Sequence, residues 1–407
     1  MKPIPHTSRL ALSVLIASLC GPAGAQAPRM AASVPAAAAP SEPALSEFRP
    51  RPSTTTRLDY SVWDDALQEF VLYGGPSLRK RERRPEPSMG SRIVHGHVSP
   101  LRLEGNKLAM EYFSDDFHDA VGAYAADLIA IGNRLDIPAL PRNEQLSYWL
   151  NLHNVLIVNA IAEAYPIKYP SRITGADGRE LHDTMLAVID GVPLSLRDIR
   201  ERIVYPHWND RRVIYGFFLG DLGSPALQRQ AYNGEDVWST LQVSADEFAT
   251  SLRGFERRGD TLRVSRVYRD VARFYFPDFE SDLRAHLLEH ANETTREELG
   301  RAAEGTIRVA IYEDTIADLT AGDGDREPLS WTVSTTQRPG ASGADAFRND
   351  NGQARPSSVV GRLLQEQRRK FQRLYKEGLI GTVFIEDINL GADAERDMPD
   401  NASASPP

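Results

Sequence analysis

Polar residues inside a strongly apolar run are the first candidates for chemistry. The run Tyr148–Asn154 reads Tyr-Trp-Leu-Asn-Leu-His-Asn, and apolar residues continue after it to position 158. At about 100° per residue, Ser147, Asn151 and Asn154 fall within one sector of a helix. A helix that is apolar on nearly every side is buried, and a buried amide is costly unless it is hydrogen-bonded. Asn151 and Asn154 therefore either clamp neighbouring backbone, the commoner role, or line a polar binding cavity.

Two other patterns could hold an ion. His95 and His97 are two residues apart, so a strand would carry both imidazoles on one face, a spacing that suits zinc or copper. Two ligands do not complete a site, and we expect a surface strand there, with no metal and no cofactor. Arg211 and Arg212 follow Asp210 just before an apolar segment. They could form an anion-binding subsite, although a structural ion pair is the commoner role of such residues.

Hydrophobic periodicity and turn residues predict the elements that would position these side chains. The predicted helices cover 60–73, 117–135, 143–165, 195–204 and 361–376, and further helices begin at Ser224, Ser244 and Ser265. The predicted strands cover 184–189, 212–219, 262–264, 307–312 and 382–388. Helices outnumber strands, so we expect an α+β fold, a mainly helical single domain with a small sheet.

Composition divides the chain into a main domain and segments of low hydrophobicity. Stretches rich in Ala, Pro, Gly and Ser cannot bury enough apolar surface to stay ordered. The expected order is a signal peptide at 1–25, a disordered linker at 26–57, the main α+β domain at 58–320, a flexible linker at 321–358, a C-terminal helix–strand extension at 359–390 and an acidic disordered tail at 391–407.

The N-terminus has the three parts of an export signal. Lys2 and Arg9 form a short, positively charged start. The apolar run that follows has about 10 residues and is shorter than the ~20 of a membrane-spanning helix. Ala23-Gly24-Ala25 offers a cleavage site, so we expect cleavage after Ala25, no transmembrane anchor, and release to the periplasm or the extracellular space. Cys20 is the only cysteine and lacks the small residue before it that a lipoprotein signal requires. It would leave with the peptide, so the mature chain has no thiolate and no disulfide.

The charge balance bears on the class of partner. Lys and Arg total 47 against 56 Asp and Glu, which gives a formal net charge of −9. Nucleic acids are bound mainly through contacts between basic residues and phosphates, so a net acidic chain is a poor candidate for this role. We expect an unknown envelope ligand or protein as partner and no nucleic acid.

Several short motifs occur in an order that resembles a known family. The run Tyr148–Asn154 is similar to the aromatic-x-Asn-x-aromatic-Asn helix of the domain of unknown function 547 family. The further matching segments are Gly191 with Leu194-Ser195-Leu196 and Asp198-Ile199, Asp210-Arg211-Arg212, Ser224-Pro225-Ala226-Leu227, and Ser265 with Asp278-Phe279. The resemblance covers about residues 100–320, and by analogy the family implies a papain-like arrangement.

The chain departs from that family where chemistry would take place. Family members commonly have Glu-His after the Asp-Ile pair and a cysteine at the start of a later helix, which is the arrangement of a thiolate nucleophile. Here these positions hold Arg200, Glu201 and Ser224, and His153 stands where the family usually has tyrosine. Ser224 before Pro225 also has a structural explanation, since serine followed by proline is typical of a helix start.

Two classes of function stay open at this point. The first is a non-catalytic envelope protein that binds a peptide, a glycan or a protein through the former site cleft. The second is an amide or ester hydrolase in which Ser224 is the nucleophile and a relocated histidine, such as His153, or Glu201 assists. A serine nucleophile needs an aligned base. The distance from Ser224 to the nearest imidazole therefore discriminates between the two classes.

Overall fold

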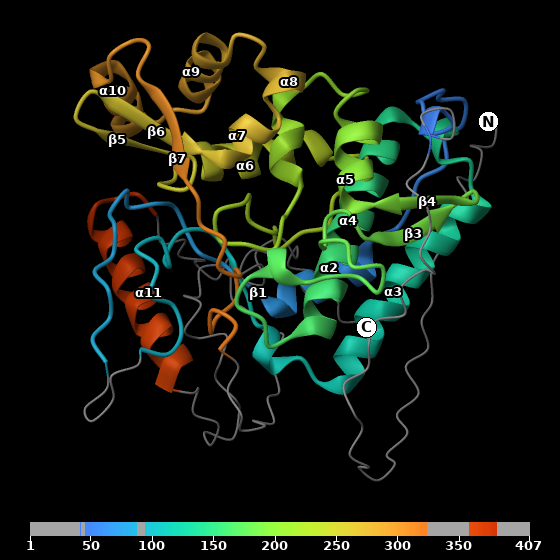
Figure 1. The fold of residues 1–407 in the computed structure, drawn as a ribbon, viewed down its shortest axis with the longest axis horizontal. Helices are drawn as coiled ribbons and strands as arrows, with labels where there is room; N and C mark the ends of the chain where they lie inside the picture. Colours follow the sequence, from blue (N-terminus) through green and yellow to red (C-terminus); the bar gives the residue numbers. More distant parts are fainter. Residues whose placement is uncertain (1–40, 42–44, 88–93, 324–357, 381–407) are drawn as a thin grey trace, which may run out of the picture.

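A long buried helix, α4 (Arg142–Ala164), forms the centre of the fold. The structure is a computed structural model that describes residues 41, 45–87, 94–323 and 358–380 (Figure 1). Every residue from Glu144 to Val158 is buried, as the apolar sequence predicts. The helix ends at Tyr165, because the residue before Pro166 is disfavoured in the helical conformation. Other elements must therefore pack around α4 on all sides.

Helix α3 (Asp115–Arg134) packs along α4 and confirms the predicted helix at 117–135. The hydroxyl of Ser114 caps its start by accepting a hydrogen bond from the amide of Phe117. Gly132 permits the close approach, because a Cβ at this position would lie 2.2 Å from the hydroxyl of Tyr148 on α4. That hydroxyl donates to the carbonyl of Leu128 at 3.0 Å, so the two helices are joined by a buried hydrogen bond.

Helix α2 (Ser61–Phe70) covers the same side of the core and confirms most of the helix predicted at 60–73, although residues 71 and 72 form a short strand. Its buried face carries Trp63, Leu67 and Phe70. The ring of Trp63 stacks on that of Tyr124 of α3, with 5.7 Å between the centroids. The apolar residues at helical spacing therefore face the core, as their periodicity indicates.

A β-hairpin follows α4 and leads into the next helical segment. Strands β3 (Met185–Ile189) and β4 (Val192–Ser195) are antiparallel. Asp190 and Gly191 both have positive φ, 50° and 75°, which a two-residue type I′ turn requires. The Ser195–Asp198 capping box opens α5 (Leu196–Asp198), which continues as a π-helical segment, Ile199–Val204.

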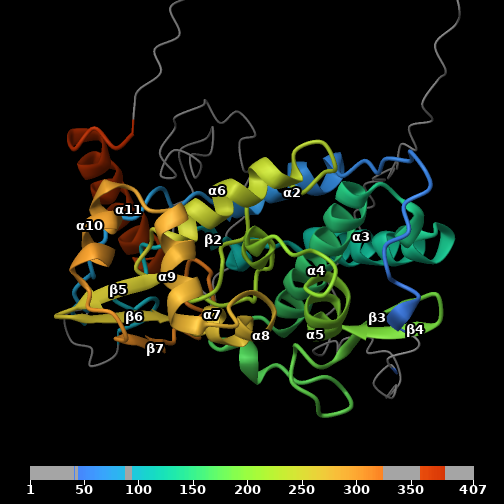
Figure 2. The same ribbon diagram turned by 90° about the horizontal axis from the view of Figure 1, so that it is seen from above.

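The second half of the domain combines short helices with a three-stranded sheet. Its helices are α6 (Val237–Ala249), α7 (Arg266–Asp270), α8 (Ala272–Tyr275), α9 (Phe279–Glu289) and α10 (Glu293–Arg301). Its strands are β5 (Phe255–Arg258), β6 (Thr261–Ser265) and β7 (Ile307–Ile311). β6 pairs antiparallel with β5 and parallel with β7. This sheet and the β3–β4 hairpin lie at opposite ends of the molecule in both views (Figures 1 and 2).

The predicted C-terminal extension begins with α11 (Ser358–Lys376), which packs on the main domain. Beneath it, β1 (Val71–Leu72) and β2 (Lys107–Leu108) form a two-stranded antiparallel sheet. The ammonium of Lys370 on α11 donates to the carbonyls of Gly74 and Leu103, both at 2.7 Å. The guanidinium of Arg102 forms two hydrogen bonds with the carboxylate of Glu366 on the same helix.

Residues 45–57 belong to the folded domain, although composition predicts a disordered linker at 26–57. Leu45 and Phe48 are buried in the core, and the amide of Ser53 donates to the carbonyl of Ala139 at 2.8 Å. These two apolar side chains and the backbone hydrogen bonds to residues 138 and 139 hold the segment, and two such residues are too few to raise its average hydrophobicity. The other boundaries stay predictions, since residues 1–25, 324–357 and 391–407, with the strand predicted at 382–388, lie outside the described residues.

Three predicted elements are wrong. Residues 211–216 form a 3₁₀ helix, not the start of a strand at 212–219. Ser224 lies in a turn and begins no helix. Ser244 lies inside α6 and donates to the carbonyl of Thr240 at 3.0 Å, so the helix begins before the proposed cap.

The described elements define a mainly helical α+β domain with small sheets of two or three strands, as predicted. One main apolar core extends from Leu45 to Ala317 and includes α4. Across the described ranges, no helix has both the length and the apolar character needed to cross a membrane.

Candidate functional site

The two buried asparagines of α4 clamp distant backbone. Asn151 donates to the carbonyl of Tyr232 at 2.6 Å and accepts from the amide of the same residue at 3.0 Å. Asn154 donates to the carbonyl of Gly216 at 2.9 Å and accepts from the amide of Phe218 at 3.1 Å. Each side chain therefore replaces a missing backbone partner, and a ligand could use these amides only by breaking these bonds. A direct binding role for either residue stays a prediction.

His153 is held in a buried chain of hydrogen bonds beside these clamps. Its Nε2 lies 2.8 Å from the Arg200 guanidinium, which can only donate, so this nitrogen accepts. Its Nδ1 then donates to the side-chain oxygen of Asn154 at 3.1 Å. Burial, followed by the neighbouring Arg200 charge, holds the pKa of His153 well below its usual value. The lone pair that a general base needs is therefore occupied by a cation that never deprotonates.

His182 belongs to the same buried chain. Its Nδ1 lies 3.4 Å from the same Arg200 nitrogen, and a backbone hydrogen bond joins the ring to Leu219. Burial and Arg200 lower its pKa as well. Arg200 stands at one of the positions where the resemblance implies chemistry, and it holds two neutral imidazoles in place there.

Ser224 has no catalytic base among its partners. Its hydroxyl donates to the carbonyl of Asp221 at 2.7 Å and accepts from the amide of Leu219 at 3.2 Å. In the part of the chain that the structure describes, no imidazole is hydrogen-bonded to this oxygen, and the residue is fully buried. The Ser224 hydroxyl therefore stabilises a turn through bonds to the backbone. It is not the helix cap that the sequence predicts.

Asp221 is the most perturbed acid near Ser224. Its carboxylate is buried and forms an ion pair with Arg266 of α7. Burial nevertheless outweighs the arginine and raises the pKa of Asp221 to about 7, with Asp314 and Glu313 adding to the shift. Among the described residues, one carboxylate oxygen, Oδ1, has no hydrogen-bond partner. A proton on this group near neutral pH is therefore a consequence of its burial.

Glu201, which the resemblance places at the family's histidine position, forms ion pairs with arginines. Its carboxylate lies 2.7 Å from Arg273 and 3.4 Å from Arg197. The candidate catalytic residues Ser224, His153 and Glu201 thus have separate partners and do not form a nucleophile–base pair within the described residues.

The proposed anion subsite is occupied by acidic partners. Arg212 forms a multiple hydrogen bond with Asp210, and its guanidinium lies over the ring of Trp238. Arg211 lies 3.8 Å from Asp282 and 3.9 Å from Glu289. Both arginines therefore form the structural ion pairs that we considered as the alternative to an anion-binding subsite. Anion binding by either arginine stays a prediction.

The two histidines of the His-x-His pattern have different environments. His97 is buried, and its Nε2 is hydrogen-bonded to the carbonyl of Asp318. Burial, with Lys107 nearby, lowers the pKa of His97 to about 3. His95 is largely exposed and lies 3.8 Å from Asp323. The expected surface strand is absent from residues 94–98, which form an irregular segment.

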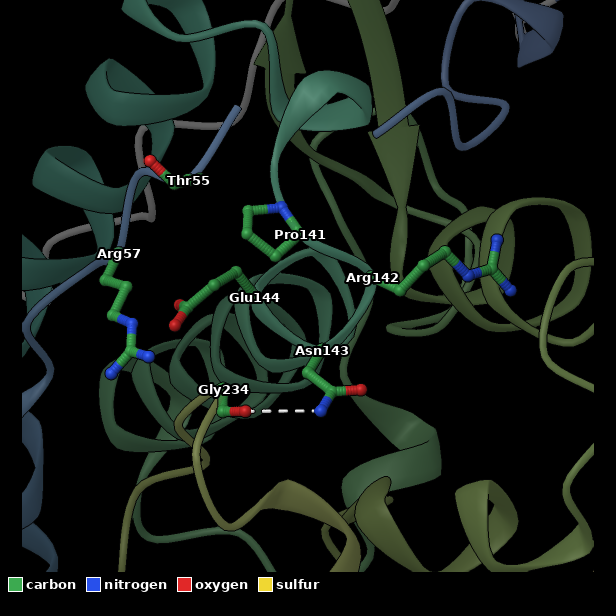
Figure 3. A pocket seen from close by; sticks show the side chains of 7 residues that line it. All are labelled: Thr55, Arg57, Pro141, Arg142, Asn143, Glu144 and Gly234. Atoms are coloured by element: carbon green, nitrogen blue, oxygen red, sulfur yellow. Dashed lines mark hydrogen bonds between the residues drawn. The ribbon is translucent and has the colours of Figure 1, made fainter. Parts of the chain in front are cut away.

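A polar cavity of about 410 Å³ lies at the N-terminal end of α4 (Figure 3). It is lined by Thr55, Arg57, Pro141, Arg142, Asn143, Glu144 and Gly234. Figure 3 shows the Arg57 and Glu144 side chains directed toward the same space, whereas Arg142 points away. The side chain of Asn143 donates to the carbonyl of Gly234 at 3.3 Å, and burial raises the pKa of Glu144. The cavity therefore presents a cation, an acid and an amide to a ligand.

A second cavity, of about 500 Å³, lies between residues 79–81 and α10. Its charges are paired internally, since Arg79 bonds to Glu298 and Arg81 to Glu256. The first cavity also has an internal ion pair, between Arg57 and Glu235, but both of these side chains are largely exposed, whereas the side chain of Arg79 is buried. A ligand can therefore reach the first cavity more easily, and it is the better candidate for binding.

A cluster that sequence reasoning missed lies at the end of α9. His286, Glu289 and His290 each bring one potential ligand atom within 4.8 Å of the others. Burial, with His290 and Arg211 nearby, lowers the pKa of His286 to about 3, so its imidazole is neutral. The signal was present in the sequence as a His-x-x-Glu-His pattern, whose i, i+3, i+4 spacing puts all three residues on one helix face.

The protein is thus an α+β domain in which the candidate catalytic residues, Ser224, His153 and Glu201, form hydrogen bonds or ion pairs within the fold. Residues 137–249 match the model of the family described as "Protein of unknown function, DUF547". The match extends from just before α4 to the end of α6. The chain therefore contains a domain of the DUF547 family, which confirms the resemblance. No curated protein and no solved structure matches the chain, so the papain-like arrangement stays a prediction.

Proposed function

We propose that this protein is an exported, non-catalytic binding protein that holds a polar part of an envelope peptide, glycan or protein in the cavity at the start of α4. The observation that supports this proposal is the open cavity of about 410 Å³ between Arg57 and Glu144. The former site cleft is a poor alternative, since Ser224 is fully buried and its hydroxyl is bonded to backbone.

The chemistry of the cavity suits a ligand that both donates and accepts hydrogen bonds. The guanidinium of Arg57 is largely exposed and can donate to a carboxylate or a carbonyl oxygen, although it also contacts Glu235. Glu144 can accept from a hydroxyl or an amide, and Asn143 can do both. Peptides and sugars carry these groups at close spacing. The proposal therefore names a polar ligand segment and excludes an aliphatic one.

Binding of the mature protein to arrays of envelope glycans and of peptides tests the proposal, followed by calorimetric titration of each ligand found. Arg57→Ala should weaken binding about tenfold or more, because a hydrogen bond to a charged group is lost. Arg49→Ala is the matched control, since this exposed arginine lies on the same segment but does not line the cavity.

Two results would overturn the proposal. One is equal loss of affinity in the Arg57 and Arg49 variants, which would place the ligand elsewhere or make its attraction a general charge effect. The other is hydrolysis of amide or ester substrates that is lost in Ser224→Ala, which would restore the hydrolase alternative.

A further inference from the structure

The end of α9 carries three groups that can bind a metal ion, and the binding proposal above does not involve them. His286 and Glu289 lie on the last turn of α9, and His290 follows as its C-cap residue. The imidazole of His286 is buried and that of His290 nearly so, while the Glu289 side chain is 62% exposed. The imidazoles of the cluster are therefore buried, and its carboxylate is open to solvent.

The hydrogen bonds of His286 leave one nitrogen unpartnered. The hydroxyl of Tyr215 lies 2.7 Å from Nε2 of His286 and 3.4 Å from the hydroxyl of Tyr268, so it can accept a proton from Nε2 while it donates to Tyr268. Nδ1 of His286 is buried and makes no hydrogen bond within the described residues, and it carries a lone pair in the tautomer whose proton is on Nε2. It faces a carboxylate oxygen of Glu289 at 3.5 Å. In that tautomer, two electron-pair donors face each other with no proton between them.

This separation fits a metal ion. Two ligand atoms at about 2.0 Å from a tetrahedral zinc ion lie about 3.3 Å apart. The 3.5 Å between His286 Nδ1 and the Glu289 oxygen is close to that value. The third ligand atom, on His290, is within 4.8 Å of both, and the exposed Glu289 can move to close the remaining distance.

The surroundings of His290 resemble the outer shell of a metal site. Its Nδ1 lies 2.7 Å from the carboxylate of Asp246 on α6, the type of partner that orients a metal-bound imidazole. Gln242 of α6 contacts both residues, at 3.3 Å from His290 Nδ1 and 2.9 Å from Asp246. Arg211 is the opposing charge, 3.9 Å from Glu289, but it also has Asp282 as a partner. Arg212, which also interacts with Asp246, is bonded to Asp210.

We propose that His286, Glu289 and His290 bind a divalent transition-metal ion of the zinc class. The mixed imidazole and carboxylate set suits zinc better than calcium or magnesium, which prefer oxygen ligands alone. Three protein ligands leave a fourth position on the solvent side, where water completes the coordination. The site departs from the sequence-based expectation of no metal, and it joins α9 to α6 through Asp246.

The test uses the full mature chain after chelator treatment and dialysis. Titration with Zn²⁺ in competition with a chromogenic chelator should give one ion per chain, and Co²⁺ should give the visible absorption of a tetrahedral site. Glu289→Gln and His290→Ala should each weaken Zn²⁺ binding by about tenfold or more, since loss of outer-shell groups alone has effects of that size. Glu289 is exposed, so its substitution keeps the fold.

Glu293→Gln and His118→Ala are the matched controls, because they remove an acid and an imidazole outside the cluster and should bind zinc like the wild type. Circular dichroism verifies folding of each variant. Absence of stoichiometric binding in the wild type overturns the proposal. Equal affinity of Glu289→Gln, His290→Ala and the controls also overturns it, because binding would then come from scattered surface groups.

Discussion

Asn151 and Asn154 use their side-chain amides to complete the backbone hydrogen bonding of segments far away in the sequence. The two asparagines fasten residues 216–218 and Tyr232 to the central helix, where no strand or helix supplies these partners. Such bonds add modest net stability, but leaving their partners unsatisfied in the core is costly. The buried asparagines are therefore sensitive positions even without a ligand.

We predict that Asn154→Ala and Asn151→Ala each lower the free energy of unfolding by about 1–3 kcal/mol, the usual cost of leaving a buried partner unsatisfied. Urea denaturation at pH 7 measures this change. Asn159→Ala is the matched control on the same helix, since its side chain bonds only to Glu163 near the surface, and it should change stability by less than about 0.5 kcal/mol. If all three variants unfold alike, the clamps contribute nothing particular to stability.

Asp221 predicts a pH dependence of stability. Its pKa is raised from 3.8 to about 7, so the folded state binds this proton more tightly than the unfolded state. Stability from this group is therefore fully present below pH 4 and falls as pH rises toward 7, with a slope of at most about 1.4 kcal/mol per pH unit. Asp221→Asn should remove this slope. Its free energy of unfolding minus that of the wild type should thus increase between pH 4 and 7.

Urea denaturation at several pH values measures this difference, and other titrating groups, such as Asp318 with its pKa near 6, cancel because both proteins contain them. Asp260→Asn, which removes an exposed carboxylate, is the control. A constant difference across the pH range for Asp221→Asn would show that Asp221 remains charged throughout and that Arg266 dominates its environment.

At the scale of elements, periodic segments could be predicted and aperiodic ones could not. The helices around Trp63, Leu128 and Leu150 follow from apolar spacing, and the Asp190-Gly191 turn follows from residue type. The error at 212–219 has a physical cause, because a fully apolar run suits a buried strand and a buried helical turn equally well. The error at Ser224 arose because serine before proline is also common in turns.

Helix α11 carries a buried lysine among its contacts with the main domain, and this gives an element-scale prediction. The buried Lys370 ammonium donates to the carbonyls of Gly74, Gly75 and Leu103, and burial lowers its pKa. Lys370→Met should leave the carbonyl of Leu103 without this donor, whereas the carbonyl of Gly74 keeps Gln367 as a donor, and should reduce stability by about 1–3 kcal/mol. Amide hydrogen exchange should accelerate in α11 before it does in α4.

Lys376→Met is the control, since this exposed lysine ends the same helix. Exchange in α11 that is as slow in Lys370→Met as in Lys376→Met would show that the apolar face and the Arg102–Glu366 pair suffice to hold the helix.

At the scale of the whole molecule, the candidate binding cavity could not be predicted from the sequence. It combines residues 55–57, the start of α4 and Gly234, which come together only through the fold. Residues 55–57 also lie in a stretch with the composition of a linker, and Asn143 stands at the predicted start of a helix without any sign of a binding role. By contrast, the metal-binding pattern at 286–290 is local, so sequence spacing alone could have indicated it.

The whole chain also carries a prediction about its maturation. We expect export with cleavage after Ala25, so that the mature N-terminus is Gln26, because a positive start, a short apolar run and Ala23-Gly24-Ala25 follow one another in the order that signal peptidase requires. Mass spectrometry and N-terminal sequencing of protein recovered from the envelope or the medium identify the mature N-terminus.

Ala25→Arg is the matched change, which should leave the precursor uncleaved and membrane-associated. An intact N-terminus in the wild type, or a lipid on Cys20, would contradict the prediction. Loss of Cys20 with the peptide would leave a chain without cysteine, consistent with a fold that relies on its core, its buried clamps and its ion pairs for stability outside the cytoplasm.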